Sequence, residues 1–264
     1  MNIFFESLFS SESARKENDI YFFDSDIDGD CFDESDKEVW YAGCFQRHLK
    51  EPSHLNNEVS RKLIEKIVEH KMPIIDVACG PGMGLIPSIK QLSPGHLCMA
   101  TDANSFVIKE WKKYLDGCPV YDNLDFAQFS LMNIQLKNNS VPAYSSNIGL
   151  SSTRAGEEGK ERALSEIYRT LIKDGFFYTI ENEWDNVDRI LKVFHAMNWE
   201  PWTEFTYPQR TWHDRFVEHN FEIVSEESMG YYQLNSDDNE LGEAAEKLGI
   251  DIGVKTTAFI LRKR

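Results

Sequence analysis

The feature that most constrains the fold is a short apolar run that passes directly into a glycine-rich stretch. Residues 74–85 read IIDVACGPGMGL, so Ile74-Ile75-Asp76-Val77-Ala78 is followed by Gly80, Gly82 and Gly84. A continuous apolar run of this length is typical of a strand that is buried on both faces. Glycine then allows the backbone to turn sharply and a ligand to lie against it. The segment therefore predicts a buried strand, a tight loop and a following helix.

Strands and helices alternate on both sides of this loop. Residues 56–70 predict an amphipathic helix capped by Asn56 or Asn57, and helices are also expected at 106–115 and 157–172. Further strands are expected at residues 96–101, 141–147, 176–180, 222–225 and 256–261. Pro142 weakens the prediction for 141–147, because proline cannot donate to a strand ladder. The alternation predicts an α/β protein with a mostly parallel sheet covered on both faces.

An acidic residue follows the second expected strand. Asp102 lies 22 positions after Gly80, and in open α/β sheets ligands bind beyond the carboxyl ends of the strands. A carboxylate there can accept hydrogen bonds from both hydroxyls of a ribose, which fits a dinucleotide or S-adenosylmethionine. The spacing is G-x-G-x-G, whereas the dinucleotide fingerprint is G-x-G-x-x-G. Asp76 beside the loop would repel a pyrophosphate but suits an ammonium and a sulfonium, so S-adenosylmethionine is favoured.

These segments resemble class I S-adenosylmethionine-dependent methyltransferases, in particular the small-molecule enzymes of ubiquinone and menaquinone biosynthesis. The likeness covers about residues 56–181 and includes DVACGPGMG, ATDAN and FSLMNIQLKNNSVPAYSSNIGL. It implies a doubly wound, mostly parallel, seven-stranded sheet of the Rossmann-like methyltransferase fold. It also implies S-adenosylmethionine as the cofactor and a small-molecule acceptor, methylated on O, N or C.

The resemblance assigns the cofactor contacts residue by residue. They are Asp76, Ala78, Gly80 and Gly82 at the methionine part, Asp102 at the ribose, Ala103 or Asn104 near the adenine, Ser130 and Leu131 flanking the adenine, and Ser146 and Asn147 bordering the methyl-transfer region. Ser130 departs from the family, which usually has an adenine-binding Asp at this position. The family often has histidines where Ser151 and Ser152 stand, so no catalytic residue is assigned.

Two segments outside these motifs are placed to cover the acceptor. Residues 1–55 are expected to form an N-terminal helical lid on a methyltransferase domain spanning 56–264, and residues 184–220 an aromatic-rich insertion. The candidate acceptor contacts are Tyr21, Trp40, Tyr41, Arg154 and Trp184. The aromatic residues of the insertion are Trp184, Trp199, Trp202, Phe205, Tyr207 and Trp212. They fit either a pocket for a flat or apolar acceptor or a satellite core.

The net charge of -16 comes from two segments. Residues 17–38 hold ten acids and one lysine, and residues 222–251 hold nine acids and one lysine. Nucleic acid and anionic membranes are not expected as partners, because both require clustered basic residues. No apolar run approaches the roughly 18 residues of a membrane span, and residues 1–6 have no basic leader. With five cysteines and no CxxC pair, a reducing cytoplasm fits best.

No metal is expected, although one acidic segment partly matches a calcium-binding loop. Residues 24–30 read DSDIDGD and match the first positions of an EF-hand calcium loop, but Ser35 occupies the position of its bidentate acid. A flexible acidic loop is the favoured interpretation.

Two other functions stay open. One is a methyltransferase-fold protein that binds the cofactor or a partner without turnover. The other is a nucleotide-dependent oxidoreductase.

Overall fold

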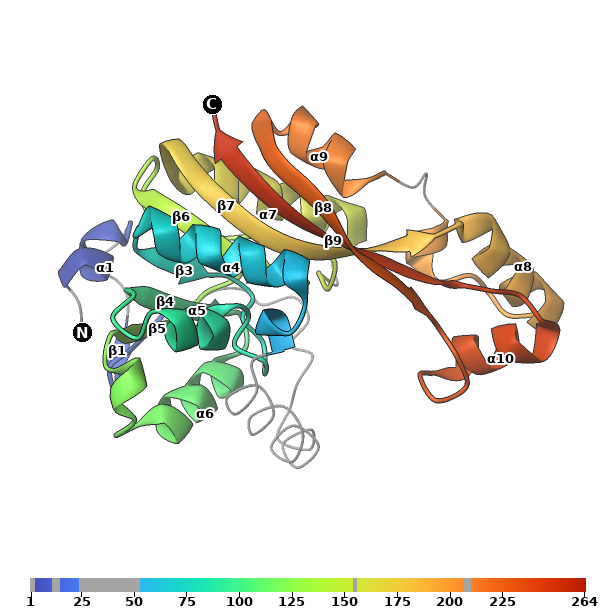
Figure 1. Ribbon diagram of the computed structural model, residues 1–264, viewed down its shortest axis with the longest axis horizontal. Helices are drawn as coiled ribbons and strands as arrows, with labels where there is room; N and C mark the ends of the chain where they lie inside the picture. The colour runs from blue at the N-terminus through green and yellow to red at the C-terminus, as the bar shows by residue number, and fades with distance from the viewer. Residues whose placement is uncertain (1–2, 11–14, 24–52, 154–155, 207–209) are drawn as a thin grey trace.

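A single mixed sheet forms the centre of the molecule. The computed structural model describes residues 3–10, 15–23, 53–153, 156–206 and 210–264 of the chain. Its nine-stranded sheet has the order β1-β2-β5-β4-β3-β6-β7-β9-β8 (Figure 1). The strands are β1 (Arg15–Glu17), β2 (Ile20–Phe22), β3 (Ile74–Asp76), β4 (Cys98–Asp102), β5 (Leu124–Gln128), β6 (Val141–Asn147), β7 (Leu171–Asp185), β8 (Phe221–Gln233) and β9 (Gly253–Lys263).

The strands from β2 to β7 in this order run parallel, and antiparallel pairs lie at both sides. β1 pairs antiparallel with β2, and β9 pairs antiparallel with both β7 and β8. The helical segments are α1 (Ile3–Leu8), η3 (Ser53–Leu55), α4 (Glu58–His70), α5 (Ile86–Leu92), α6 (Ser105–Leu115), η4 (Pro119–Tyr121), α7 (Gly156–Thr170), α8 (Val187–Met197), η5 (Thr203–Phe205), α9 (Trp212–Glu218) and α10 (Glu240–Leu248). Because parallel neighbours need crossover connections, the helices between them cover both faces of the sheet.

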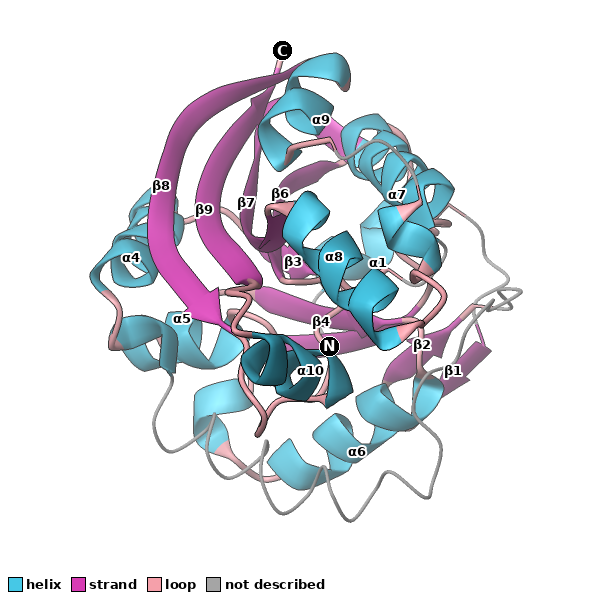
Figure 2. Ribbon diagram, turned by 90° about the vertical axis from the view of Figure 1, so that its right-hand side faces the viewer, coloured by secondary structure: helices cyan, strands magenta, loops and turns pink. Residues whose placement is uncertain are grey.

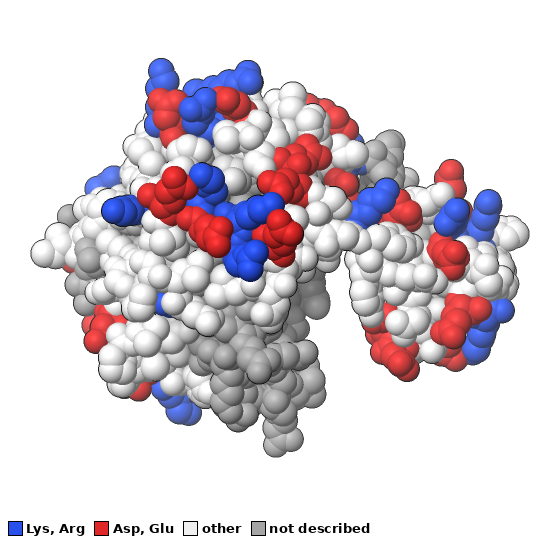
Figure 3. Space-filling view, in the orientation of Figure 1, with Lys and Arg blue, Asp and Glu red and all other residues white. Residues whose placement is uncertain are grey.

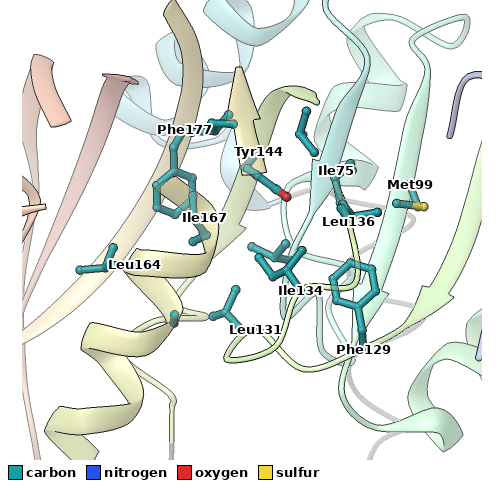
Figure 4. Close-up of a cluster of buried hydrophobic side chains, with 14 of the residues drawn as sticks. Ile75, Met99, Phe129, Leu131, Ile134, Leu136, Tyr144, Leu164, Ile167 and Phe177 are labelled. Atoms are coloured by element: carbon teal, nitrogen blue, oxygen red, sulfur yellow. The ribbon is translucent and has the colours of Figure 1, made fainter. Parts of the chain in front are cut away.

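Each face of the sheet has its own apolar core. On one face, α4, α5 and α6 contribute residues such as Ile64, Ile89 and Trp111. On the other face lie α1, α7 and α9, and Figure 4 shows Leu164 and Ile167 of α7 against Tyr144 of β6 and Phe177 of β7. This arrangement confirms the predicted doubly wound α/β class.

The capping and strand predictions near the glycine loop are confirmed. The Asn57 side chain accepts hydrogen bonds from the backbone nitrogens of Val59 and Ser60, which fixes the start of α4. β6 spans Val141–Asn147 despite Pro142, because its register with β7 shifts between Val141 and Ala143. At that irregularity the proline has no ladder partner to lose.

Beyond the sheet's main body, the long strands carry a separate lobe. We call this lobe the arm; it comprises residues 184–205 and 231–254, including α8, η5 and α10 (Figures 1 and 2). The arm has its own apolar cluster, which includes Ile190, Phe194, Phe205 and Leu241. Trp184 and Trp199 pack against this cluster. These aromatic residues of the expected insertion therefore form a satellite core.

The structure corrects the sequence-based fold in two respects. The sheet has nine strands where seven were expected. In addition, the described residues of the segment expected to form a helical lid contain only the short helix α1 and the 3-10 helix η3, and β1 and β2 extend the sheet beyond β5. Phe5 is fully buried in the apolar core on the α7 side of the sheet, so this part of the expected lid is integral to the sheet domain.

The surface charges mix both signs. Figure 3 shows lysine and arginine interspersed with acidic side chains on the face it presents. Each described helix is too short or too polar to cross a bilayer.

Candidate functional site

The loop after β3 follows a path that few residue types tolerate. Ala78, Gly80, Met83 and Gly84 all have positive φ, from 51° to 55°. A Cβ atom on Gly84 would lie 1.9 Å from Oδ1 of Asp76. The left-handed conformation favours glycine at position 84, and the close approach of the carboxylate requires it.

Asp76 lies beneath this loop and is fully buried. Its Oδ2 accepts hydrogen bonds from the backbone nitrogen of Leu85 at 3.1 Å and from Oγ of Ser145 at 2.6 Å. Its Oδ1 has no hydrogen-bond partner among the described residues. Burial raises the pKa of Asp76 to about 7, and the two hydrogen bonds oppose part of that shift. A cationic group bound nearby would favour the ionised form.

Asp102, at the end of β4, joins the loop to the next helix. Its Oδ2 accepts from the backbone nitrogen of Gly80 and its Oδ1 from that of Asn104, both at 2.8 Å. Asn104 in turn caps α6 by accepting from the backbone nitrogens of Phe106 and Val107. These backbone donors fix the carboxylate of Asp102 at the carboxyl end of β4.

The predicted adenine side is built from the ends of β4 and β5. Ser130 and Leu131 are both buried, and Oγ of Ser130 accepts from the backbone nitrogen of Met132 at 3.2 Å. Gln128 was not singled out from the sequence. Its Nε2 donates to the backbone oxygen of Ala103 at 2.9 Å and so ties β5 to the loop after β4. The sequence signal that could have revealed Gln128 was an amide side chain at the end of an apolar strand.

The end of β6 lies against the glycine loop. Ser146 is fully buried, and its Oγ has no hydrogen-bond partner among the described residues. A Cβ on Gly149 would lie 2.4 Å from that oxygen and 3.0 Å from Cβ of Ala78. The predicted residues Ala78 and Ser146 are therefore brought together. The buried Oγ of Ser146 lies close to Gly149 in the loop after β6.

A buried acid that sequence reasoning missed holds the loop after β6. Glu181 of β7 accepts from the backbone nitrogen of Ser151 at 2.8 Å and from its hydroxyl at 2.5 Å. The hydroxyl of Thr179 donates to the same carboxylate at 2.6 Å. Burial raises the pKa of Glu181, and these donors oppose the shift. The signal was an acid that ends the apolar strand FFYTIE.

A cavity of about 310 Å³ opens beside this loop, at the carboxyl ends of β6 and β7. Ile148, Ser151 and Ser152 line one side, and the other walls come from β7, α7, α9, η5 and β9. Trp184 and Trp212 are the aromatic members of its lining. Ile148 directly follows Asn147, so the cavity adjoins the residues predicted to border methyl transfer.

The other predicted acceptor contacts do not line this cavity or lie outside the described residues. Tyr21 lies in β2, where its hydroxyl donates to Glu6, and it is absent from the cavity wall. Trp40, Tyr41, Arg154 and Tyr207 lie outside the described residues, as does the Asp24–Asp30 loop. Of the described histidines, none lines the cavity. Among the described residues, no group of His, Cys, Asp and Glu side chains could hold a metal ion.

The donor set around the glycine loop fits S-adenosylmethionine better than a dinucleotide. An orphaned carboxylate oxygen on Asp76 suits the amino-acid part of that cofactor, whereas it would oppose a pyrophosphate. The carboxylate of Asp102 is held in place by backbone donors, as a ribose-binding acid must be. The residues present therefore fit the cofactor that the sequence favoured.

Comparison with known proteins agrees with this geometry. Residues 75–179 match a family model described as a methyltransferase domain. No curated protein sequence matches the chain.

Solved structures share the fold at low sequence identity. The MccD protein is 18% identical with a TM-score of 0.54, and the match covers 79% of this chain and 99% of that one. The geranyl diphosphate C-methyltransferase of Streptomyces coelicolor A3(2), solved with S-adenosyl-L-homocysteine, is 10% identical with a TM-score of 0.51, covering 78% and 76%. The [4+2]-cyclase SpnF is 14% identical with a TM-score of 0.51, covering 77% and 81%. At these identities the likeness extends to the fold alone, and it includes a protein named for a different reaction.

Proposed function

We infer that this chain, which carries a class I S-adenosylmethionine-dependent methyltransferase domain, transfers a methyl group to a small-molecule acceptor. The single observation that carries the inference is the carboxylate of Asp102. It is held by the backbone nitrogens of Gly80 and Asn104 at the carboxyl end of the sheet. That placement supports a ribose-binding role for Asp102, because in open α/β sheets ligands bind beyond the carboxyl ends of the strands.

The chain's own residues divide the work of binding. Asp102 would hold the ribose hydroxyls, and Gln128 and Ser130 shape the adenine side. Asp76 and Ser146 offer buried oxygens toward the amino-acid part, beneath Ala78, Gly80 and Gly82. When bound, the cofactor supplies an activated methyl group on a sulfonium. The protein's main tasks are then to align the acceptor and to exclude water.

We propose the cavity at the ends of β6 and β7 as the acceptor site. Glu181 supports this assignment, because it fixes the loop of Ser151 between the glycine loop and the cavity. Trp184 lines the cavity and stays a candidate acceptor contact. We also propose that residues 1–55 cap the domain formed by residues 56–264. The packing of Phe5 and β2 into the core of that domain supports this.

We further propose that the protein works in the cytoplasm and acts on neither nucleic acid nor membranes. The three described cysteines, Cys79, Cys98 and Cys118, are free thiols, which fits a reducing compartment. The net charge of -16 opposes binding to a polyanion.

Cofactor binding tests the proposal directly. In Asp102→Ala, the affinity for S-adenosylmethionine should weaken by about 1.5–3 kcal/mol, because charge-assisted hydrogen bonds to the ribose are lost. Isothermal titration calorimetry on the two proteins measures this difference. Asp116→Ala is the matched control, since Asp116 lies at the other end of α6 and is paired with Lys112. Unchanged affinity in Asp102→Ala would remove Asp102 from the site.

Turnover separates an enzyme from a binding protein of the same fold. Incubation with S-adenosylmethionine and a panel of metabolites should yield S-adenosylhomocysteine with at least one acceptor. Tight cofactor binding with no product across the panel would support the binding-protein alternative.

A further inference from the structure

The polar composition of the cavity beside Trp184 and Trp212 distinguishes it from an apolar acceptor pocket. Six of its lining residues are charged: Glu157, Lys160, Glu183, Glu204, Arg210 and Arg215. A flat, purely apolar acceptor would remove water from these groups without offering them a hydrogen bond in return. The charged groups and their partners therefore decide which ligand the cavity suits.

Each cationic side chain on the wall already binds carboxylates. Arg215 is almost fully buried and bridges Glu157 and Glu161. Arg210 pairs with Glu161 at 2.9 Å and also with Glu218, and Lys160 pairs with Glu157 at 3.1 Å. An anionic ligand would have to displace these partners.

Two further carboxylates on the wall have different partners. Glu183 accepts a hydrogen bond from the backbone nitrogen of Trp212, and no described lysine or arginine forms an ion pair with it. Glu204 is attracted by the charge of Lys160 and accepts a hydrogen bond from the side chain of Trp184. The wall itself holds three carboxylates and three cations. Together with the partner acids Glu161 and Glu218, and with His219 bound to Glu161, they form a group in which carboxylates outnumber lysine and arginine by five to three. The local excess is negative.

The two indoles of the cavity differ in what they already contact. The Trp212 ring has the protein's own cations beside it, with Lys160 Nζ at 5.9 Å and Arg215 Cζ at 5.5 Å from its centroid, so Trp184 is the ring left for a ligand cation. Indole is the side chain that binds a cation most strongly through its ring face. Trp184 is held by contact with the Phe205 ring at 5.4 Å, which limits its movement.

We propose that this cavity binds a small organic cation, an amine in its protonated form, and that the amine is the methyl acceptor. This proposal rests on the proposed function and names its substrate class. Glu183 and Glu204 bind the ammonium group, and the indoles of Trp184 and Trp212 contact its carbon skeleton. The carboxylate of Glu204 first takes one proton from the bound ammonium, which frees the lone pair on nitrogen. That lone pair forms the N–C bond while the S–C bond breaks with its electron pair left on sulfur. Burial raises the pKa of Glu204, which makes it a better proton acceptor than an exposed glutamate.

Three probes of similar shape test the charge preference. Benzylamine, benzyl alcohol and benzoate are titrated into the full-length protein by calorimetry at pH 7.5, with S-adenosylhomocysteine present throughout. Benzylamine should bind at least tenfold more tightly than either of the others. Glu183→Gln and Glu204→Gln should each weaken benzylamine about fivefold or more while leaving benzyl alcohol unchanged. Glu158→Gln is the matched control, because Glu158 is exposed on α7 and does not line the cavity.

The outcomes separate this inference from the proposed function. Equal binding of the three probes, or benzylamine binding that survives both glutamine variants, overturns the amine proposal. Product formation with alcohols or acids but not with amines also overturns it, and leaves methyl transfer intact. A failure of S-adenosylmethionine to bind the wild-type protein counts against the proposed function instead. Two variants are used because Glu204 lies in the short η5 segment and Glu183 in the long strand β7. A folding defect in one variant would leave the other as a valid test.

Discussion

The glycine loop and the arm are built by opposite means. In the loop, single atoms decide the structure. The absence of a Cβ on Gly84 leaves room for Asp76, and the carboxylate of Asp102 connects the backbone at Gly80 to that at Asn104. In the arm, shared apolar area decides it, with Phe194 in ring contact with Trp199, Trp202 and Phe205. The comparison teaches that the loop should tolerate almost no substitution locally, whereas the arm should respond in proportion to the area removed.

The largest expected effect is in the arm. Phe194→Ala should lower the free energy of unfolding by about 3–5 kcal/mol, because a large ring is removed from a buried cluster. Urea denaturation measures the loss, and calorimetry should find the affinity for S-adenosylmethionine unchanged. Leu248→Ala is the control, since Leu248 of α10 is an exposed residue of the same lobe. Loss of cofactor binding in Phe194→Ala would show that the two regions are not independent.

Gly84→Ala should come next. The left-handed conformation and the clash with Asp76 together should cost about 2–4 kcal/mol of stability, and cofactor binding should be lost with the loop geometry. Gly95→Ala makes the matched comparison, because a Cβ there meets no atom within 4 Å. If both alanine variants unfold at the same urea concentration as wild type, the account of the loop is wrong.

A smaller effect should follow pH. Burial raises the pKa of Asp76 to about 7, so in the absence of cofactor the native protein keeps this proton up to that pH, while the unfolded chain loses it near 3.8. The contribution of Asp76 to stability therefore falls as pH rises from about 4 to 7. Bound positive charge favours the ionised form, so cofactor affinity should rise about tenfold between pH 6 and pH 8.

Asp76→Asn isolates that dependence from the titration of the cofactor itself. Its affinity for S-adenosylmethionine, measured by calorimetry over the same range, should lack the rise that wild type shows beyond the cofactor's own ionisation. Parallel pH profiles in the two proteins would mean that Asp76 does not exchange a proton on binding.

The smallest effect is expected from calcium. The DSDIDGD segment belongs to neither region and lacks the bidentate acid of a calcium loop. Millimolar calcium should therefore leave Tm unchanged in a thermal melt. A steep rise of Tm would reveal a native-state calcium site.

The sequence predicted the elements whose signals are local. The cap at Asn57, the strand Val141–Asn147 and the acid Asp102 each depend on a few neighbouring residues, and each lies where it was expected. Whether Asp102 binds a ribose stays a prediction.

Other parts depended on contacts made far along the chain. The expected strand 222–225 continues to Gln233 because it pairs along the whole length of β9, although SMGYYQ shows no strand periodicity. The hairpin of β1 and β2 was missed because Arg15, Lys16 and Glu17 are all exposed and charged, so β1 has no apolar face. Its turn residues, Asn18 and Asp19 with positive φ, were the signal that could have revealed it.

The open edges of the nine-stranded sheet bear on how the protein avoids aggregation. β8 presents its outer backbone over 13 residues, and β1 presents the other edge. A flat edge of that length would recruit strands from other molecules. Here β8 carries Glu222, Glu226 and Glu227 and is bent by register shifts near Ile223 and Ser228, while β1 is short and charged. The glutamates of β8 thus oppose the addition of strands from other molecules at high protein concentration.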